Sequence, residues 1–125
     1  MPYAIGKAFS FAAGHHIDEL PDGHKCRRPH GHTYTAEFEI SAPGLTGPGF
    51  VTDFGDLAAV GRLIQDHLDH TMLNDVLPTA PTSENLARHL AEWFIETVEP
   101  RIHGCLRAVV VRESPTTWAR WEAER

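Results

Sequence analysis

The sequence is poor in the features that mark secreted, membrane-spanning and nucleic-acid-binding proteins. It has two cysteines in 125 residues, too few for a disulfide framework, which favours a reducing, cytoplasmic location. No apolar run approaches the roughly 18–20 residues of a membrane helix, and the N-terminus lacks the pattern of a signal peptide. The formal net charge of −6 argues against nucleic acid or an anionic membrane as the main partner.

Length and composition are those of an ordinary globular protein. The chain is 42% hydrophobic and 22% charged, and it is long enough to bury a sizeable core. No linker, internal repeat or low-complexity segment divides it. We therefore expect a single domain that covers residues 1–125.

Alternation of bulky and small or polar residues predicts four strands. Residues 3–12 place their large side chains on one face, and residues 32–40 carry the cleanest alternation of the chain. Residues 106–113 and 117–122 predict two further strands, joined by a turn at Ser114-Pro115.

Two helices are predicted between these pairs of strands. Asp53 is typical of a helix cap, and apolar residues then recur at helical spacing up to Leu68. Thr82 or Ser83 caps a second helix, which Pro100 prevents from continuing. The order β-β-α-α-β-β predicts an α+β fold, an antiparallel sheet with both helices on one face. Such a sheet leaves two open edges, which favours oligomerisation.

His30 and His32 are candidate metal ligands. Residues two apart on a strand point to the same face, so the two imidazoles can converge. Together with one imidazole from elsewhere, for which His15 is the upstream candidate, they would give the three-nitrogen set of a catalytic zinc site that keeps one coordination position open. Cys26, close before His30, is either a fourth ligand or a separate reactive group. The alternative is a group of solvated loop histidines, but a His-x-His pair entering a strand favours metal binding.

A basic cluster, Lys25, Arg27 and Arg28, lies beside these candidate ligands. In an acidic protein such a cluster is either a solvated loop or a site for an anionic substrate, and the residues alone leave both open.

Two further positions carry groups that can do chemistry. Asp69-His70 follows the first predicted helix, where the imidazole either interacts with the helix dipole or reaches into a cleft. Glu113 shares a strand face with two valines, and an unpaired buried carboxylate is costly. It therefore either reaches solvent or binds a group that offers hydrogen-bond donors.

Six short motifs occur in order between residues 9 and 113: Phe9-Ser10-Phe11-Ala12-Ala13-Gly14-His15, His24-Lys25-Cys26, Cys-x-x-x-His-Gly-His from residue 26 to 32, Leu68-Asp69-His70, Pro81-Thr82-Ser83-Glu84-Asn85, and Arg112-Glu113. Together they resemble the 6-pyruvoyltetrahydropterin synthase family, and within it most closely the bacterial 6-carboxytetrahydropterin synthases of the queuosine (7-deazaguanine) pathway. Two positions depart from the family pattern, Gly14 in place of a more usual Ala and His16 in place of Arg. His16 could compete with His15 for the metal, but His15 keeps the family's spacing to Cys26.

The resemblance implies a fold, an assembly and a set of site residues. The fold is the tunnelling fold, and members typically form a hexamer of two stacked trimers with active sites between subunits. The implied roles are zinc on His15, His30 and His32; proton abstraction by Cys26; relay and support by Asp69, His70 and Glu113; pterin anchoring by Glu113 with Thr82, Ser83 and Glu84; and triphosphate binding by Lys25, Arg27 or Arg28.

The resemblance also implies a reaction. A zinc-dependent lyase of this kind converts 7,8-dihydroneopterin triphosphate into 6-carboxytetrahydropterin, acetaldehyde and triphosphate. The same residues could instead stop at 6-pyruvoyltetrahydropterin, the product of the biopterin-type pathway. A non-catalytic zinc- or pterin-binding module is the remaining alternative.

Overall fold

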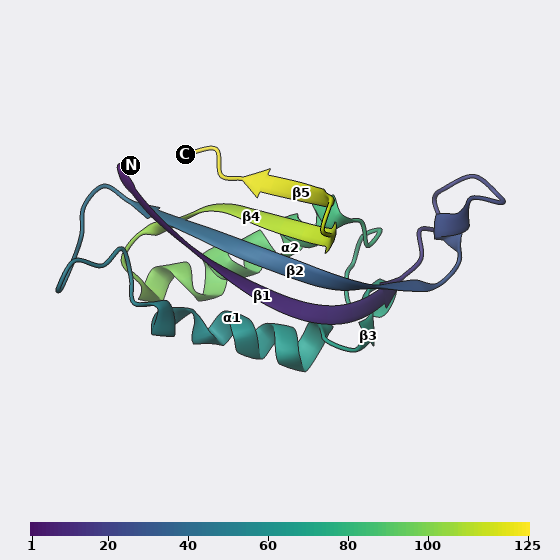
Figure 1. Cartoon of the computed structure of the whole chain (residues 1–125), viewed down its shortest axis with the longest axis horizontal. Helices are drawn as coiled ribbons and strands as arrows, with labels where there is room; N and C mark the ends of the chain where they lie inside the picture. The colour runs from purple at the N-terminus through teal and green to yellow at the C-terminus, as the bar shows by residue number, and fades with distance from the viewer.

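The computed structural model describes residues 1–125 as a five-stranded sheet with two helices on one of its faces (Figure 1). The order of strands across the sheet is β3-β1-β2-β4-β5. None of the helices has the length and apolar character needed to cross a lipid bilayer. The strands are β1 (Tyr3–His15), β2 (His30–Ala42), β3 (Thr71–Met72), β4 (Cys105–Ser114) and β5 (Thr117–Glu122), and the helices are α1 (Ala58–Leu63) and α2 (Ser83–Thr97).

Four of the strands and both helices lie where the sequence predicts them, and β3 is an addition. This two-residue strand pairs in parallel with Ala13 and Gly14 of β1, so the sheet is mixed where we expected a purely antiparallel one. Two residues are too few to produce a detectable period. The first helical segment also differs in detail, because α1 is preceded by a 3-10 turn, Phe54–Leu57, and followed by a π-helical segment, Ile64–Leu68.

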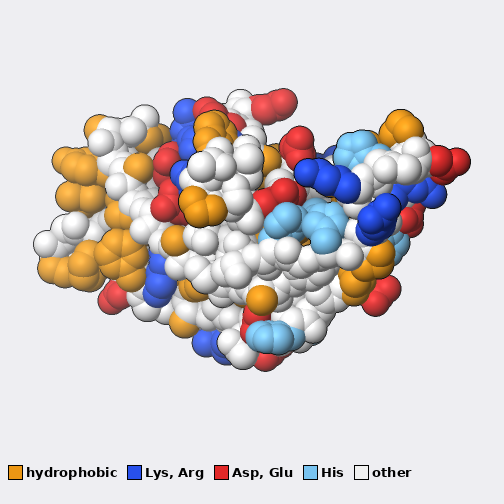
Figure 2. Space-filling view, turned by 45° about the vertical axis from the view of Figure 1, so that its right-hand side comes forward, with side chains coloured by type: hydrophobic (Ala, Val, Ile, Leu, Met, Phe, Trp, Pro, Cys, Tyr) orange, Lys and Arg blue, Asp and Glu red, His pale blue; other side chains and the backbone are white.

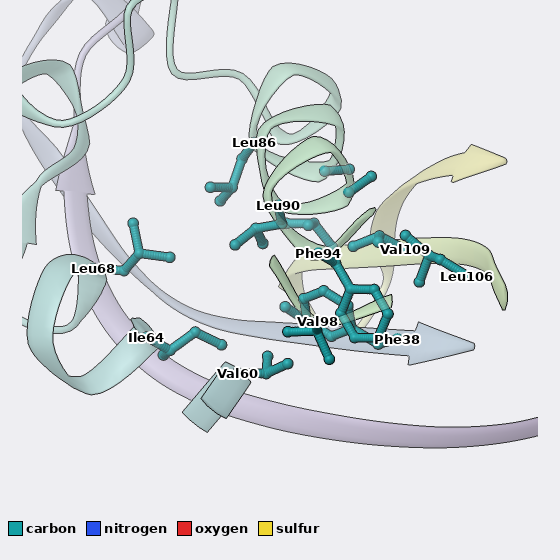
Figure 3. Close-up of a cluster of buried hydrophobic side chains, with 14 of the residues drawn as sticks. Phe38, Val60, Ile64, Leu68, Leu86, Leu90, Phe94, Val98, Leu106 and Val109 are labelled. Atoms are coloured by element: carbon teal, nitrogen blue, oxygen red, sulfur yellow. The ribbon is translucent and has the colours of Figure 1, made fainter. Parts of the chain in front are cut away.

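The hydrophobic core lies between the sheet and the helices (Figure 3). Phe94 of α2 stacks on Phe38 of β2 with ring centroids 5.5 Å apart. Leu90 of α2 and Val109 of β4 are fully buried beside them. This packing clamps α2 against the sheet and so fixes the position of the helix's first turn, which borders the site described below.

The long β1–β2 hairpin carries the candidate metal ligands at one end of the sheet. In its antiparallel register His15 pairs with His30, and Ala13 pairs with His32. The connection between the strands, residues 16–29, extends beyond the sheet (Figure 1) and contains a single 3-10 turn, Lys25–Arg27.

Both edges of the sheet are largely open. β5 forms one edge, and on the other β3 pairs with only Ala13 and Gly14 of β1. Most of β1 therefore presents unpaired backbone groups along that edge, in agreement with the two open sheet edges expected from the sequence.

Candidate metal centre and adjoining pocket

Three histidines converge at the end of the β1–β2 hairpin. One ring nitrogen from each of His15, His30 and His32 lies within 4.8 Å of the other two. The ring centroid of His15 is 4.5 Å from that of His30 and 5.0 Å from that of His32. The strand register therefore produces the cluster that the His-x-His spacing predicts. Figure 2 shows histidine side chains gathered on this face between acidic and basic ones.

Hydrogen bonds to backbone carbonyls fix the tautomers of two of these rings. Nδ1 of His15 lies 2.7 Å from the Pro81 carbonyl, and Nδ1 of His30 lies 2.7 Å from the Arg28 carbonyl. A carbonyl only accepts hydrogen bonds, so each Nδ1 carries the proton and each Nε2 keeps a free lone pair. This is the arrangement in which a histidine binds a metal through Nε2 while a second group orients the ring.

The third ring leaves a buried nitrogen without a partner. Nε2 of His32 is buried and makes no hydrogen bond, and the nearest carboxylate oxygen, Oε2 of Glu113, lies 3.9 Å away. Buried polar atoms are nearly always hydrogen-bonded, so an exception requires an explanation. A metal ion held by the three Nε2 atoms provides one, and the donor set suits zinc.

The surroundings of His15 favour its neutral form. The pKa of His15 is lowered chiefly by burial and less by the neighbouring rings of His30 and His32, while the Pro81 carbonyl and the Glu113 carboxylate act in the opposite direction. Beneath the ring lies Tyr34, which is fully buried, and its hydroxyl is 3.3 Å from Nδ1 of His15. Burial also raises the pKa of Tyr34 well above its ordinary value, so the phenol stays neutral. A neutral imidazole is the form that binds metal.

A pocket of about 630 Å³ opens beside the three histidines. This volume lies within the range of small-molecule sites. The pocket brings together nine of the predicted site residues, which come from the hairpin, the first turn of α2 and the end of β4. Its lining consists of His15, Ile17, Leu20, Lys25, Cys26, His30, His32, Thr82, Ser83, Glu84 and Glu113.

Glu113 is held at the border of this pocket by the first turn of α2. The Ser83 hydroxyl donates to Oε1 of Glu113 over 2.6 Å, which leaves Oε2 available to a ligand. Thr82 is the helix cap, and its hydroxyl accepts from the Asn85 N–H. The side chain of Asn85 in turn donates to the Ala80 carbonyl. These bonds fix the connector before α2, and with it the Pro81 carbonyl that orients His15.

Cys26 lines the pocket but is not part of the group of potential ligand atoms, which contains only the three histidines. Its backbone is fixed on both sides, because Nδ1 of His24 accepts from the Cys26 N–H and the Ile17 N–H donates to the Cys26 carbonyl. The geometry thus favours a separate reactive thiol over a fourth ligand.

The three basic residues of the loop occupy different positions. Lys25 lines the pocket. The guanidinium of Arg27 donates to the carbonyls of Asp18 and Leu20, so this side chain holds the loop together. Neither Arg27 nor Arg28 lines the pocket.

Asp69 and His70 form a hydrogen-bonded pair that lies outside this pocket. Nδ1 of His70 is 2.9 Å from Oδ2 of Asp69, and the Ala12 N–H donates to Oδ1 of Asp69. The Ala12 N–H, aided by His70, lowers the pKa of Asp69. The His70 side chain is 82% exposed, and its φ of 60° places a non-glycine residue in the left-handed region. Within one chain, the structure does not bring this pair together with Cys26.

Several residues that contact the candidate site residues, or the chain beside them, were not predicted as site residues. His24 is exposed, and its ring accepts from the Cys26 N–H. Tyr34 was predicted only as part of an alternating strand, yet its place two residues after His32 puts it on the same face. Pro81 acts through a backbone carbonyl, which no side-chain pattern reveals. Asn74 contacts the chain beside His15, and no motif marks it.

The departures at Gly14 and His16 have structural explanations. A Cβ atom on Gly14 would lie 3.3 Å from both the His30 carbonyl oxygen and a methyl carbon of Met72, so glycine allows β3 to approach β1 closely. His16 directs its ring to Asp18 and is not part of the metal cluster, whereas His15 is.

Comparison with protein families and curated proteins gives a consistent result. Residues 4–124 match the family described as 6-pyruvoyl tetrahydropterin synthase. A 6-carboxy-5,6,7,8-tetrahydropterin synthase of Synechocystis is 38% identical over 129 residues, which cover 98% of this chain and 95% of that protein. A protein of the same name from Bacillus subtilis is 29% identical and covers 99% of this chain and 89% of its own.

Solved structures share the fold at lower identity. An uncharacterized protein of Wolinella succinogenes superimposes with a TM-score of 0.87 at 22% identity, covering 98% of both chains. The 6-pyruvoyl tetrahydropterin synthase of Caenorhabditis elegans superimposes with a TM-score of 0.82 at 24% identity, covering 98% of this chain and 96% of the other.

Proposed function

Since this chain belongs to the 6-pyruvoyl tetrahydropterin synthase family, we propose that it is a zinc-dependent 6-carboxy-5,6,7,8-tetrahydropterin synthase. The reaction takes 7,8-dihydroneopterin triphosphate and water to 6-carboxytetrahydropterin, acetaldehyde and triphosphate. The observation that carries the proposal is one pocket that holds three converging histidines, a thiol outside their cluster and a carboxylate at its border. The names of the Synechocystis and Bacillus subtilis relatives support the carboxy product.

His15, His30 and His32 would hold the zinc ion. The free Nε2 atoms of the first two and the unpartnered Nε2 of His32 fit that role. Bound there, zinc supplies a Lewis acid next to the hydroxyl groups of the substrate side chain.

The remaining side chains of the pocket divide the other tasks. Glu113, oriented by Ser83, accepts hydrogen bonds from the amino and ring N–H groups of the pterin. Cys26 accepts the proton that leaves the substrate side chain. Lys25 pairs with the triphosphate, a role that suits it better than Arg27, whose guanidinium is already bonded to two loop carbonyls.

Asp69 and His70 complete the site in an assembly of several copies. In one chain His70 lines a second cavity of about 460 Å³ together with Gly14, Gly31 and Thr33, and Asp69 bonds to the His70 ring. The open edges of β1 and β5 provide the means of association. We therefore place each active site between subunits of a hexamer of two trimers, where His70 of one copy relays protons in the pocket of a neighbouring copy.

Product analysis tests the reaction. Zinc-loaded protein incubated with 7,8-dihydroneopterin triphosphate should yield a carboxypterin and acetaldehyde, identified by mass spectrometry. A pyruvoyl product would assign the chain to the biopterin-type reaction instead, and the absence of any turnover would favour a binding module. His30→Ala is the control, because losing one of three ligands should abolish both metal binding and product.

Mixing two inactive variants tests the shared site. Cys26→Ala and His70→Ala should each be inactive alone. If the thiol and the imidazole of one site come from different copies, subunits exchanged between the two variants should regain part of the activity. Inactivity of properly mixed oligomers would contradict the arrangement between subunits.

The product of the proposed reaction suggests its biosynthetic role, and the two free cysteines suggest its cellular compartment. A carboxylated tetrahydropterin would be the precursor for an enzyme that rebuilds the ring into a 7-deazaguanine, as in queuosine biosynthesis. Both cysteines are free thiols, which suits a reducing compartment such as the cytoplasm.

A further inference from the structure

The segment that follows α1 lies alongside the end of β1 and bonds to it almost residue by residue. The Ala12 N–H donates to the Asp69 carboxylate, and the Ala12 carbonyl accepts from the His70 N–H over 2.6 Å. β3 then pairs in parallel with Ala13 and Gly14. These contacts fix the chain up to the residue before His15.

Beyond β3, a side chain replaces the missing backbone partner. Oδ1 of Asn74 accepts from the His16 N–H over 3.0 Å, and Nδ2 of Asn74 donates to the His16 carbonyl over 2.9 Å. This pair of bonds also fixes the orientation of the carboxamide, because only one placement of its oxygen and nitrogen satisfies both partners. The carboxamide thus acts as one more residue of a parallel strand.

His15 is consequently bracketed on this edge, with Gly14 held by β3 on one side and His16 held by Asn74 on the other. On the opposite edge His15 pairs with His30. The next residue, Ile17, donates its N–H to the Cys26 carbonyl. The two hydrogen bonds between Asn74 and His16, here called the Asn74 clamp, therefore lie between the metal ligand His15 and the contact that holds the loop carrying Cys26. Asn74 itself belongs neither to the metal cluster nor to the pocket lining.

We infer that Asn74 is a positioning residue for the metal centre, which holds the backbone of His16 so that the His15 ring stays aimed at the site shared with His30 and His32. The inference rests on the proposed metal site. A ligand whose backbone is held in place loses less conformational freedom when the metal binds, and groups that orient ligands typically contribute about 10- to 100-fold to metal affinity. Asn74 acts one residue away from the ligand, so we expect an effect near the lower end, about 10-fold.

Three variants separate the clamp from its alternatives. Asn74→Ala removes both hydrogen bonds. Asn74→Asp keeps the size of the side chain and the acceptor for the His16 N–H, but it replaces the donor with an oxygen that faces the His16 carbonyl. If the two hydrogen bonds matter, this variant should behave like Asn74→Ala. If only the volume of the side chain matters, it should behave like the wild type. Asp75→Asn is the matched control, because Asp75 is exposed in the same turn.

The measurement is zinc affinity, by competition of the metal-free protein with a chromophoric chelator well below the unfolding temperature, together with the visible spectrum of the Co²⁺-substituted protein. We expect Asn74→Ala and Asn74→Asp to bind zinc about 10-fold more weakly with an altered Co²⁺ spectrum, and Asp75→Asn to match the wild type. Wild-type affinity and spectrum in both Asn74 variants would overturn the inference and leave the metal site intact. A wild-type protein that binds no zinc would overturn the metal site, and the inference with it.

Discussion

Replacing Glu113 with glutamine tests how the pocket recognises a pterin. The substitution conserves the shape of the side chain and keeps an oxygen for the Ser83 hydroxyl, which lies 2.6 Å from Oε1. It removes the charge and directs an amide N–H₂ group toward the donors of the ligand. A hydrogen bond to a charged group contributes about 1.5–3 kcal/mol, so we expect the dissociation constant for a pterin to rise by roughly 10- to 150-fold.

Isothermal titration with unsubstituted pterin, which lacks the reactive side chain, measures this effect without turnover. The thermal unfolding midpoint should change little, because the Glu113 side chain is partly exposed and its bond to Ser83 survives. Glu92→Gln is the matched control, since Glu92 is exposed on α2. An unchanged pterin affinity in Glu113→Gln would refute the assignment of the carboxylate as the anchor.

Three further predictions concern the thiol, the basic loop and the pair outside the pocket. Cys26→Ala should retain one equivalent of zinc but lose turnover by about 100-fold or more, and metal loss on analysis of bound zinc would show instead that the thiol is a ligand. Lys25→Gln should raise KM for the triphosphate substrate, whereas Arg27→Gln should chiefly lower the unfolding temperature because it releases two loop carbonyls; the reverse pattern would exchange their roles. Because the pKa of Asp69 in the folded protein lies below its ordinary value of 3.8, its stabilising contribution is present above that value and is lost as the pH falls through the lowered pKa. Urea unfolding should therefore show Asp69→Asn to be less stable than the wild type near neutral pH, with the difference shrinking below about pH 4, and a pH-independent difference would contradict this.

Sequence periodicity was sufficient to predict most of the fold. The alternation in β2 predicts both the strand and the common face of His30 and His32, because a side-chain period of two leaves little freedom. β3 could not be predicted in the same way, since two residues carry no period. β3 makes the sheet mixed instead of antiparallel, and it pairs with Gly14 of β1.

The candidate site was predictable as a set of residue types, but not as an arrangement. His16 could compete with His15 as a ligand in the sequence, although the spacing to Cys26 favours His15; the structure places His15 and not His16 beside His30 and His32. The sequence could not assign different roles to Lys25 and Arg27, because the hydrogen bonds of Arg27 depend on how the loop folds. Asp69 and His70 lie apart from Cys26, and a sequence contains no information about which copy of a chain supplies a group.

The Pro81 carbonyl has a consequence for any attempt to change which compound this scaffold accepts. The segment that leads into the first turn of α2 carries that carbonyl, which orients His15, and also Ser83, which donates to the Glu113 carboxylate. A substitution introduced there to recruit a different heterocycle would also rotate the imidazole. Redesign of selectivity would therefore have to be followed by metal titration as well as by substrate screening, since both properties depend on the same four residues, 81–84.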